Sequence, residues 1–257
     1  MSTYVISDIH GQLDALKALL SMISFNYKSD TLYLLGDYVD WGPKSIETVL
    51  FIKELIDKHD NIIALMGNHD LMMYNVVKLV KETYSINEAI EVSNRVDYGC
   101  WTMNGGDVTL TSYMSQTKEV RDNIKQFVAN LPYFKITEPI NGQVYYLCHS
   151  KPYVNGMELV DIVWDRIRDG ILPRSFMDRD DKAILVSGHT IVSNYRSIDD
   201  DWNLKIYKSP NNRYINIDCG GKLIGMRDGY RLAALRLDDL KEYYVDEFYN
   251  EKGSLFR

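Results

Sequence analysis

Side chains that could bind metal ions follow directly after apolar runs of the sequence. The run TYVIS precedes Asp8 and His10, and the run TLYLL precedes Asp37 and Asp40. Later apolar runs end in the same way, at Asn68, His69, Asp70, His149 and His189. Taken singly, an aspartate after a strand is usually a turn former or a helix cap. At five successive strand ends, however, so many polar groups would be costly to bury unless a cation lies between them.

The donor types restrict the choice of cation. Nitrogen and oxygen donors without thiolate favour Mn, Fe or Zn, because sulfur-rich sites suit softer metals and all-oxygen sites suit Mg or Ca. About seven donors are too many for one ion. The sequence therefore predicts two divalent metal ions. Mn is the first choice, but the donor types do not separate it from Fe or Zn.

The elements that must position these residues alternate between strand-like and helical patterns at the start of the chain, which is typical of βαβ units. Ligand sites in such sheets lie outside the carboxyl ends of the strands, so the strand-end residues are expected to converge. From about residue 70 to 130 the pattern is helical and polar, and from Lys135 onward strands dominate. No linker or repeat is evident, which predicts one domain over residues 1–257 with a helical insertion at about 70–130.

Composition excludes several classes of protein. A net charge of −7 argues against binding to a nucleic acid backbone. No apolar run is long enough for a membrane span, and the N-terminus lacks the pattern of a signal peptide. Cys100, Cys148 and Cys219 are odd in number and far apart, which indicates free thiols in a reducing compartment. We therefore expect a cytoplasmic protein that does not contact membranes.

Five short blocks together resemble a known family. SDIHG, GDYVDWG, GNHD, CHS and GHT resemble, in order, the blocks of PPP-type calcineurin-like metallophosphoesterases. The likeness is closest to small bacterial and phage serine/threonine protein phosphatases, and WTMNGGD, IVWDR and YINIDCGG extend it over nearly the whole chain. The resemblance implies an α/β (α+β) fold with four layers, α/β/β/α, in which two packed mixed β-sheets are flanked by helices.

The resemblance also implies a role for each strand-end residue. Asp37 would bridge two metal ions, and a water between the ions would be the nucleophile. His69 would be the general acid, with Asp40 orienting its ring, and Arg166 would bind phosphate. The implied metal ligands are Asp8, His10, Asp37, Asn68, His149 and His189.

The predicted activity is metal-dependent hydrolysis of phosphoric monoesters, with a phosphorylated protein or a small phosphorylated molecule as substrate. A serine/threonine or broad-specificity protein phosphatase is the main hypothesis. The alternatives are a symmetrical dinucleoside tetraphosphatase and a catalytically weakened phosphate-binding protein. Retention of both Asp40 and His69 argues against the last, because a binding protein needs no acid.

Trp41 departs from the family pattern, which has a phosphate-binding arginine at this position. Three hypotheses follow: weakened catalysis, stacking of the indole on an aromatic or nucleobase leaving group, or packing of Trp41 against the insertion. Lys44 could replace part of the missing charge if it points inward. Trp101 is expected either to wall the site or to anchor the insertion by packing. The segment after Lys241 is expected to be an edge strand or a partner contact.

Overall fold

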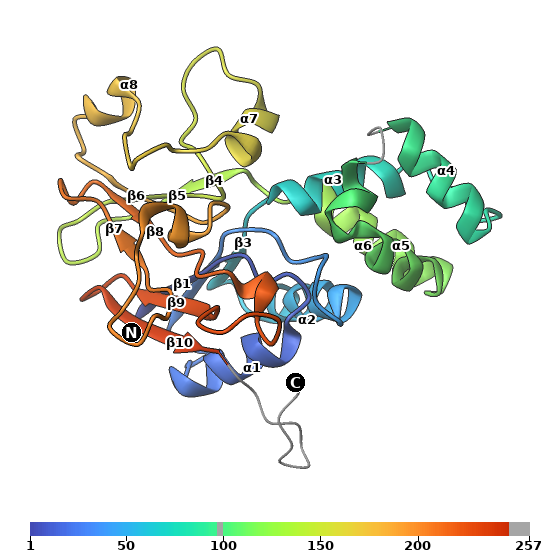
Figure 1. Cartoon of the computed structure of the whole chain (residues 1–257), viewed down its shortest axis with the longest axis horizontal. Helices are drawn as coiled ribbons and strands as arrows, with labels where there is room; N and C mark the ends of the chain where they lie inside the picture. Colours follow the sequence, from blue (N-terminus) through green and yellow to red (C-terminus); the bar gives the residue numbers. More distant parts are fainter. Residues whose placement is uncertain (97–99, 247–257) are drawn as a thin grey trace.

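The computed structural model describes residues 1–96 and 100–246 and places two five-stranded sheets in that part of the chain (Figure 1). The first sheet has the order β10-β9-β1-β2-β3 and the second the order β4-β5-β6-β8-β7. The strands of the first sheet are β1 (Thr3–Ile6), β2 (Thr31–Leu34), β3 (Ile62–Ala64), β9 (Leu232–Arg236) and β10 (Lys241–Val245). Those of the second are β4 (Phe134–Ile136), β5 (Tyr145–Cys148), β6 (Ile184–Ser187), β7 (Tyr207–Lys208) and β8 (Tyr214–Asn216).

Both sheets are mixed. In the first sheet β1, β2 and β3 run parallel, and β9 and β10 are antiparallel to their neighbours. In the second sheet β5, β6 and β8 run parallel, and β4 and β7 pair in the antiparallel sense. The carboxyl ends of the parallel strands therefore point the same way within each sheet, as the sequence predicted for the loops that carry the polar residues.

The two sheets pack face to face over an apolar layer. Successive side chains of a strand point to opposite faces, so each strand contributes to two layers. In β1, Val5 lies between the sheets, whereas Tyr4 and Ile6 face the helices. Tyr33 of β2 and Leu147 of β5 belong to the same inter-sheet layer as Val5.

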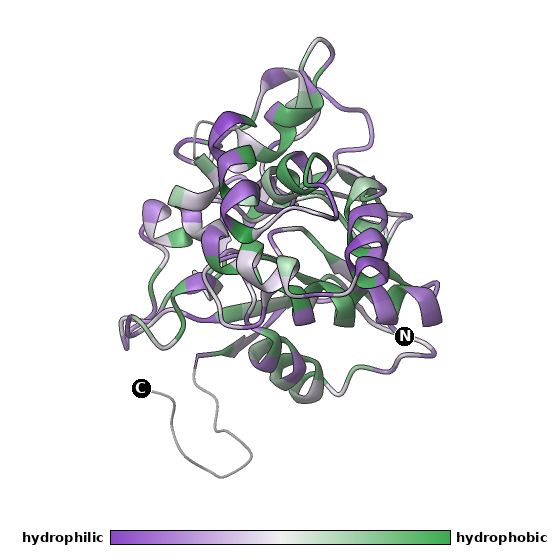
Figure 2. Cartoon of the chain, turned by 90° about the vertical axis from the view of Figure 1, so that its right-hand side faces the viewer, coloured by the Kyte–Doolittle hydropathy of each residue, from purple (hydrophilic) through white to green (hydrophobic). Residues whose placement is uncertain are grey.

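Helices cover the outer faces. α1 (Leu13–Met22) and α2 (Ser45–Lys58) pack on the first sheet, and α7 (Leu159–Trp164) and α8 (Arg174–Met177) lie over the second (Figure 1). Green and purple residues alternate along the helices in Figure 2, as expected for helices with one buried face. The predicted four-layer α/β/β/α fold is confirmed.

The helical segment predicted at about 70–130 projects to one side of the sheets (Figure 1). It consists of α3 (Asn68–Val77), α4 (Ile86–Val96), the irregular turn η1 (Thr102–Gly106), α5 (Asp107–Met114) and α6 (Lys118–Ala129). Residues 97–99 lie outside the described part of this segment. Two short 3₁₀ turns, η2 (Val192–Tyr195) and η3 (Gly221–Leu223), occur in the second half of the chain. The division into one domain with an insertion stays a prediction.

Several smaller expectations can be compared with the structure. Cys148 and Cys219 are buried free thiols as predicted, and Cys100 is half-buried and also free. The sequence analysis did not identify β4, because its three residues are all exposed and too few to establish an alternating pattern. The segment after Lys241 contributes the edge strand β10, while residues 247–257 lie outside the described part. Among the described helices, none combines the length and apolarity needed to cross a bilayer.

Candidate metal centre

The loops that follow the parallel strands hold strained backbone. Positive φ angles occur at Asp8 (54°), His10 (48°), Asp37 (58°), Asp40 (74°) and His189 (65°). A left-handed residue other than glycine costs about 1–3 kcal/mol and persists where the surrounding structure imposes it, which is typical of functional sites. The backbone conformation of these loops therefore fixes the directions of the side chains that the sequence analysis singled out.

A glycine allows two of these loops to approach each other closely. A Cβ atom at Gly67, after β3, would lie 2.2 Å from both the backbone nitrogen and Oδ1 of Asp37, after β2. Asp70 then joins the loops, because its carboxylate accepts hydrogen bonds from the backbone N–H groups of Asp37, Tyr38 and Gly67 at 2.8–3.0 Å. Burial, reinforced by the charge of Asp37, raises the pKa of Asp70 to about 7. The sequence analysis placed Asp70 among the strand-end polar residues but gave it no specific role, and this bridging role was missed.

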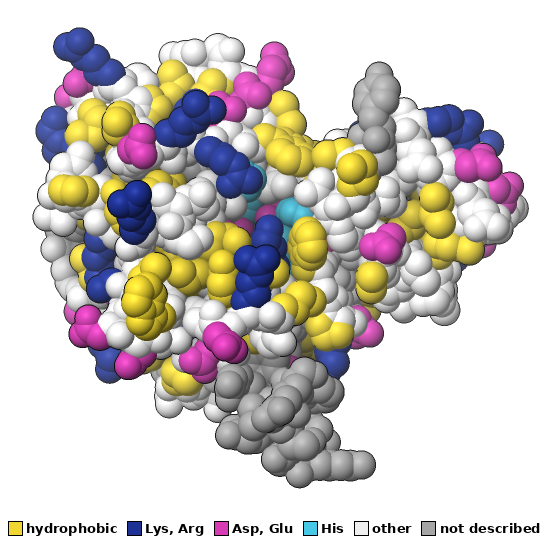
Figure 3. All heavy atoms as spheres, viewed as in Figure 1, with side chains coloured by type: hydrophobic (Ala, Val, Ile, Leu, Met, Phe, Trp, Pro, Cys, Tyr) yellow, Lys and Arg dark blue, Asp and Glu magenta, His cyan; other side chains and the backbone are white. Residues whose placement is uncertain are grey.

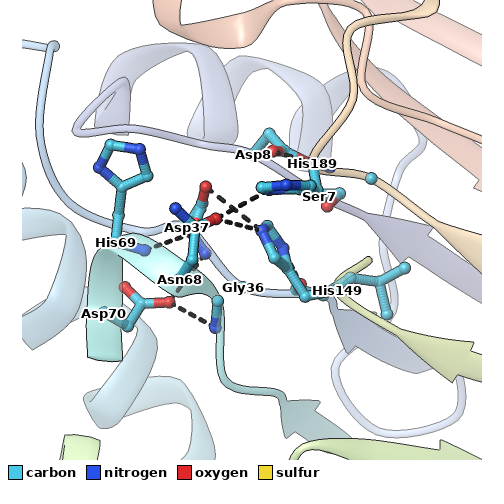
Figure 4. A network of polar contacts seen from close by, with 12 residues as sticks. Ser7, Asp8, Gly36, Asp37, Asn68, His69, Asp70, His149 and His189 are labelled. Carbon is cyan, nitrogen blue, oxygen red and sulfur yellow. Dashed lines mark hydrogen bonds and ion pairs between the residues drawn. The ribbon is translucent and has the colours of Figure 1, made fainter. Parts of the chain in front are cut away.

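Asp37 lies at the centre of the site (Figure 4). Its Oδ2 atom is 3.5 Å from Nε2 of His10 and 3.4 Å from Nε2 of His149. Its Oδ1 atom accepts the backbone N–H of His69 at 2.9 Å. Burial by itself would raise the pKa of Asp37, but the neighbouring histidines, His149 first, hold it well below its usual value. Asp37 is therefore an anion.

Two groups of donor atoms share this carboxylate. One is formed by His10, Asp37 and His69, the other by Asp37, His149 and His189, and within each group the donor atoms lie within 4.8 Å of one another. Asn68 adds an amide oxygen to the second group, 2.9 Å from Nε2 of His149 and 2.8 Å from Nδ1 of His189. A carboxylate shared by two donor groups is the arrangement expected for a binuclear site.

The histidine tautomers fit a metal site. Nδ1 of His10 faces the carbonyl of Val39 at 2.9 Å, and Nδ1 of His149 faces the carbonyl of Leu35 at the same distance. Because a carbonyl can only accept, these nitrogens carry hydrogen, so Nε2 of each ring is the nitrogen directed to the site and would present a lone pair to a bound metal.

In both histidines, Nε2 faces oxygen atoms that can only accept hydrogen bonds. Nε2 of His149 faces the oxygens of Asn68 and Asp37, so either a proton or a metal cation must lie between them. In the metal-free chain burial opposes protonation of His149, but the charge of Asp37 prevails and raises its pKa to about 9. The residues present therefore fit divalent metal ions.

Asp8 lies beside the two donor groups but in neither of them. Its carboxylate accepts the backbone N–H of His189 at 3.0 and 3.1 Å and the hydroxyl of Ser7. Burial is the main cause of its raised pKa, Asp37 raises the pKa further, and His149 opposes the change. The carboxylate of Asp8 thus interacts electrostatically with Asp37 and His149. Its role as a metal ligand stays a prediction.

His69 and Asp40 form the pair that the resemblance predicted. Nδ1 of His69 lies 2.7 Å from Oδ2 of Asp40, which leaves Nε2 for another partner. Burial alone would lower the pKa of His69, but the charges of Asp37 and Asp40 raise it. Since His69 also belongs to the first donor group, its bond to Asp40 is what distinguishes it from the other histidines.

The helical insertion contributes two unpredicted partners of Asp40. Nε1 of Trp101 donates to its Oδ2 at 2.9 Å, and the hydroxyl of Thr109 donates to its Oδ1 at 2.6 Å. The predicted packing role of Trp101 is consistent with its complete burial, and the hydrogen bond adds a second role. Nothing in the local sequence indicated Thr109.

Cationic side chains surround the centre unevenly. Arg166 is exposed and donates to the Thr190 hydroxyl at 3.0 Å and to the His189 carbonyl at 3.4 Å, so it lies at the rim of the site. Lys44 pairs with Asp14 on α1 at 2.7 Å, so in this structure it does not replace the family arginine. Figure 3 shows a hollow in which histidine and acidic side chains are visible, with Lys or Arg side chains at its edge.

Comparison with models of protein families identifies the family of this chain. The model of the calcineurin-like phosphoesterase family matches residues 1–225. The chain belongs to this family. The predicted recognition is therefore confirmed at the family level, and membership indicates a metal-binding hydrolase.

Two curated relatives of this chain have the same activity in their names. A symmetrical bis(5'-nucleosyl)-tetraphosphatase of Buchnera aphidicola is 40% identical over 101 residues, which are 38% of this chain and 35% of that protein. One of Pseudomonas fluorescens is 34% identical over 104 residues, or 39% of this chain and 36% of that protein. The matches thus span about a third of these relatives.

Solved structures extend the likeness in fold. A putative diadenosine tetraphosphatase has a TM-score of 0.60 at 20% identity, covering 95% of this chain and 92% of that one. A protein serine/threonine phosphatase from Saccharomyces cerevisiae also has a TM-score of 0.60, at 15% identity, covering 95% of this chain and 79% of that one. At these identities the likeness shows the fold and does not distinguish the two activities.

Proposed function

We propose that this phosphoesterase cleaves symmetrical dinucleoside tetraphosphates into two nucleoside diphosphates. The observation that carries the proposal is the pair of donor groups that share Asp37, with the His69–Asp40 pair beside them. The substrate class is suggested by the curated relatives, which are named symmetrical tetraphosphatases. The main hypothesis of the sequence analysis, a protein phosphatase, becomes the second candidate.

The six predicted ligands would hold two divalent ions, with Mn as the first choice, and the nitrogen and oxygen donors would accept Fe or Zn as well. When bound, these ions would polarise the phosphoryl oxygens and lower the pKa of the attacking water. The ligands are Asp8, His10, Asp37, Asn68, His149 and His189, and Asp37 would be the shared one.

The remaining side chains would handle the proton and the phosphate charge. Water forms a bond to one of the two inner phosphorus atoms, and the bond from that phosphorus to the central bridging oxygen breaks. This oxygen leaves on the second nucleoside diphosphate, and Nε2 of His69 can give it a proton while Asp40 holds Nδ1. Arg166, at the rim beside His189, is placed to bind non-bridging oxygens.

A phosphomonoesterase that acts on phosphorylated serine or threonine is the second candidate. The bond between His69 and Asp40 favours it, because a serine or threonine alkoxide needs a proton as it leaves. A nucleoside diphosphate needs this help less, since its terminal phosphate ionises near neutral pH.

The two candidates are separated by their rates with Mn²⁺. The measurement compares kcat/KM for diadenosine tetraphosphate, p-nitrophenyl phosphate and a phosphoserine peptide, using Asp37→Asn as the blank and the surface variant Asp57→Asn as the control. We expect ADP as the sole nucleotide product and at least tenfold higher kcat/KM for the tetraphosphate. Faster hydrolysis of the peptide would replace this proposal with the second candidate. Rates equal to the blank for all three substrates would reject both.

A further inference from the structure

A lysine that the sequence analysis did not single out lies next to the metal centre. Lys222 belongs to η3, and the preceding residue, Gly221, packs on the backbone of Asp8. A Cβ atom at position 221 would lie 2.5 Å from the Asp8 carbonyl oxygen. The left-handed Gly220, with φ of 80°, makes the turn that brings this segment to the loop after β1.

Trp41 reaches the same loop from another direction. Its neighbour Gly42 packs on the backbone of His10, where a Cβ atom at position 42 would lie 2.1 Å from the His10 carbonyl oxygen. Two separate loops therefore bring Trp41 and Lys222 to the segment that carries Asp8 and His10. The two side chains meet, because the ammonium of Lys222 lies over the indole ring, 5.2 Å from its centroid.

The ammonium of Lys222 is available to bind an anion. Within residues 1–96 and 100–246 its ammonium has no hydrogen bond or ion pair to a protein group, whereas the ammonium of Lys44 is paired with Asp14. The segment that carries Lys222 packs on the loop of Asp8 and His10, so this charge lies beside the metal centre.

We propose that Lys222 is the second phosphate-binding cation of this site, in addition to Arg166, and that Trp41 supports its ammonium. An indole cannot grip phosphate as an arginine does, but its face attracts a cation. The positive charge that the family resemblance leads one to expect at position 41 thus comes from position 222. The inference rests on the proposed function in one respect: the anion bound is the phosphate chain of the substrate.

The contacts of Trp41 favour one of the hypotheses for its role. The ring is in contact with the insertion, since a Cβ atom at Gly105 would lie 3.2–3.3 Å from indole atoms. The face that Lys222 covers is not open to a nucleobase. Trp41 therefore packs against the insertion and carries a cation, and stacking of a leaving group on that face is not proposed.

Binding of inorganic phosphate tests the inference without relying on catalysis. The affinity of the Mn-loaded chain for phosphate is measured by calorimetry for the native protein, Lys222→Gln, Lys222→Arg and Trp41→Leu. Lys17→Gln is the matched control, because the ammonium of Lys17 also lies over an aromatic ring, 5.1 Å from the centroid of Phe51 on α2. Bound Mn is counted for each variant, and circular dichroism verifies folding.

We expect Lys222→Gln to weaken phosphate binding at least tenfold with its metal content unchanged, and Trp41→Leu to weaken it severalfold. Lys222→Arg and Lys17→Gln should bind phosphate within twofold of the native protein. Adding Trp41→Arg to Lys222→Gln should restore binding, because it returns a cation to the site. Native affinity in Lys222→Gln would overturn the inference, even if the tetraphosphate is hydrolysed. Weakened binding in a chain that hydrolyses none of the substrates would support the inference and reject the proposed function alone.

Discussion

At the scale of single residues, the charges of Asp37 and Asp40 would set the pH range in which His69, the proposed acid, is protonated. Burial would lower the pKa of His69, but Asp37 and Asp40 raise it, so the imidazolium persists to higher pH. An acid is active only while protonated, and activity is therefore lost as pH rises through this pKa.

The first prediction follows from removing one of these charges. Asp40→Asn should lower the pKa of His69 and move the alkaline limb of the kcat profile for a phosphomonoester to lower pH. It should also reduce kcat by roughly 10²–10⁴-fold, the usual range for a general acid. Asp14→Asn, which removes an exposed carboxylate on α1, should leave the profile unchanged. An unshifted alkaline limb in Asp40→Asn would show that His69 is not the acid.

The second prediction concerns Asp37, the carboxylate common to both donor groups. Asp37→Asn should lower the Mn content from two ions per chain to less than one, because both ions lose an anionic ligand. His149→Ala removes a donor from the second group only, so it should retain about one ion. Elemental analysis after dialysis measures both values. Equal metal content in the two variants would contradict the shared role of Asp37.

At the scale of elements, the helical insertion is joined to the His69–Asp40 pair through Asp40. Trp101 and Thr109 both donate to this buried carboxylate, and neither residue is adjacent to it in the sequence. The insertion therefore holds the orientation of Asp40, and through Asp40 that of the His69 ring.

The third prediction uses two threonines of α5. Thr109→Val leaves the buried Asp40 carboxylate without one donor, which should cost about 1–3 kcal/mol of stability and lower kcat. Thr111→Val is the matched control, since its exposed hydroxyl bonds only the carbonyl of Asp107. Urea unfolding gives the stability, and a lower pKa in the kcat profile of Thr109→Val would identify a positioning role. If the two variants behave alike, the insertion does not hold Asp40.

Much of this arrangement could be predicted from the sequence, and the parts that could not have a common cause. Short apolar runs followed by Asp or His identified β1, β2, β5 and β6 and the side chains after them, because strand ends are marked locally. The partners of those side chains are not marked locally. Thr109, Lys222 and the bridging role of Asp70 depend on contacts between distant segments, which neither spacing nor composition encodes.

At the scale of the whole molecule, buried charges leave the metal-free chain with unfavourable interactions. Asp8, Asp37 and His149 lie close together at 3% exposure or less, and bound cations would offset the repulsion and the cost of burial. Ligands that bind only the folded state stabilise it by mass action.

The fourth prediction is that removal of metal destabilises the fold. At a free Mn²⁺ concentration one hundred times the Kd, each site adds about 2.7 kcal/mol. The two sites together add about 5.4 kcal/mol. With about 2–4 °C per kcal/mol for a chain of this size, EDTA should lower Tm by about 11–22 °C. Calorimetry with and without EDTA measures the shift, and Asp37→Asn should show less than half of it. An equal Tm of the native chain with and without EDTA would argue against any bound metal.

The two donor groups differ in where they come from. His10, Asp37 and His69 all follow strands of the first sheet, whereas His149 and His189 follow β5 and β6 of the second. The first group could therefore assemble as soon as the N-terminal strands pair, but the second requires both sheets to have docked. If two ions bind as proposed, uptake of the second would report that the sheets have docked, and a chain with undocked sheets would hold only one ion.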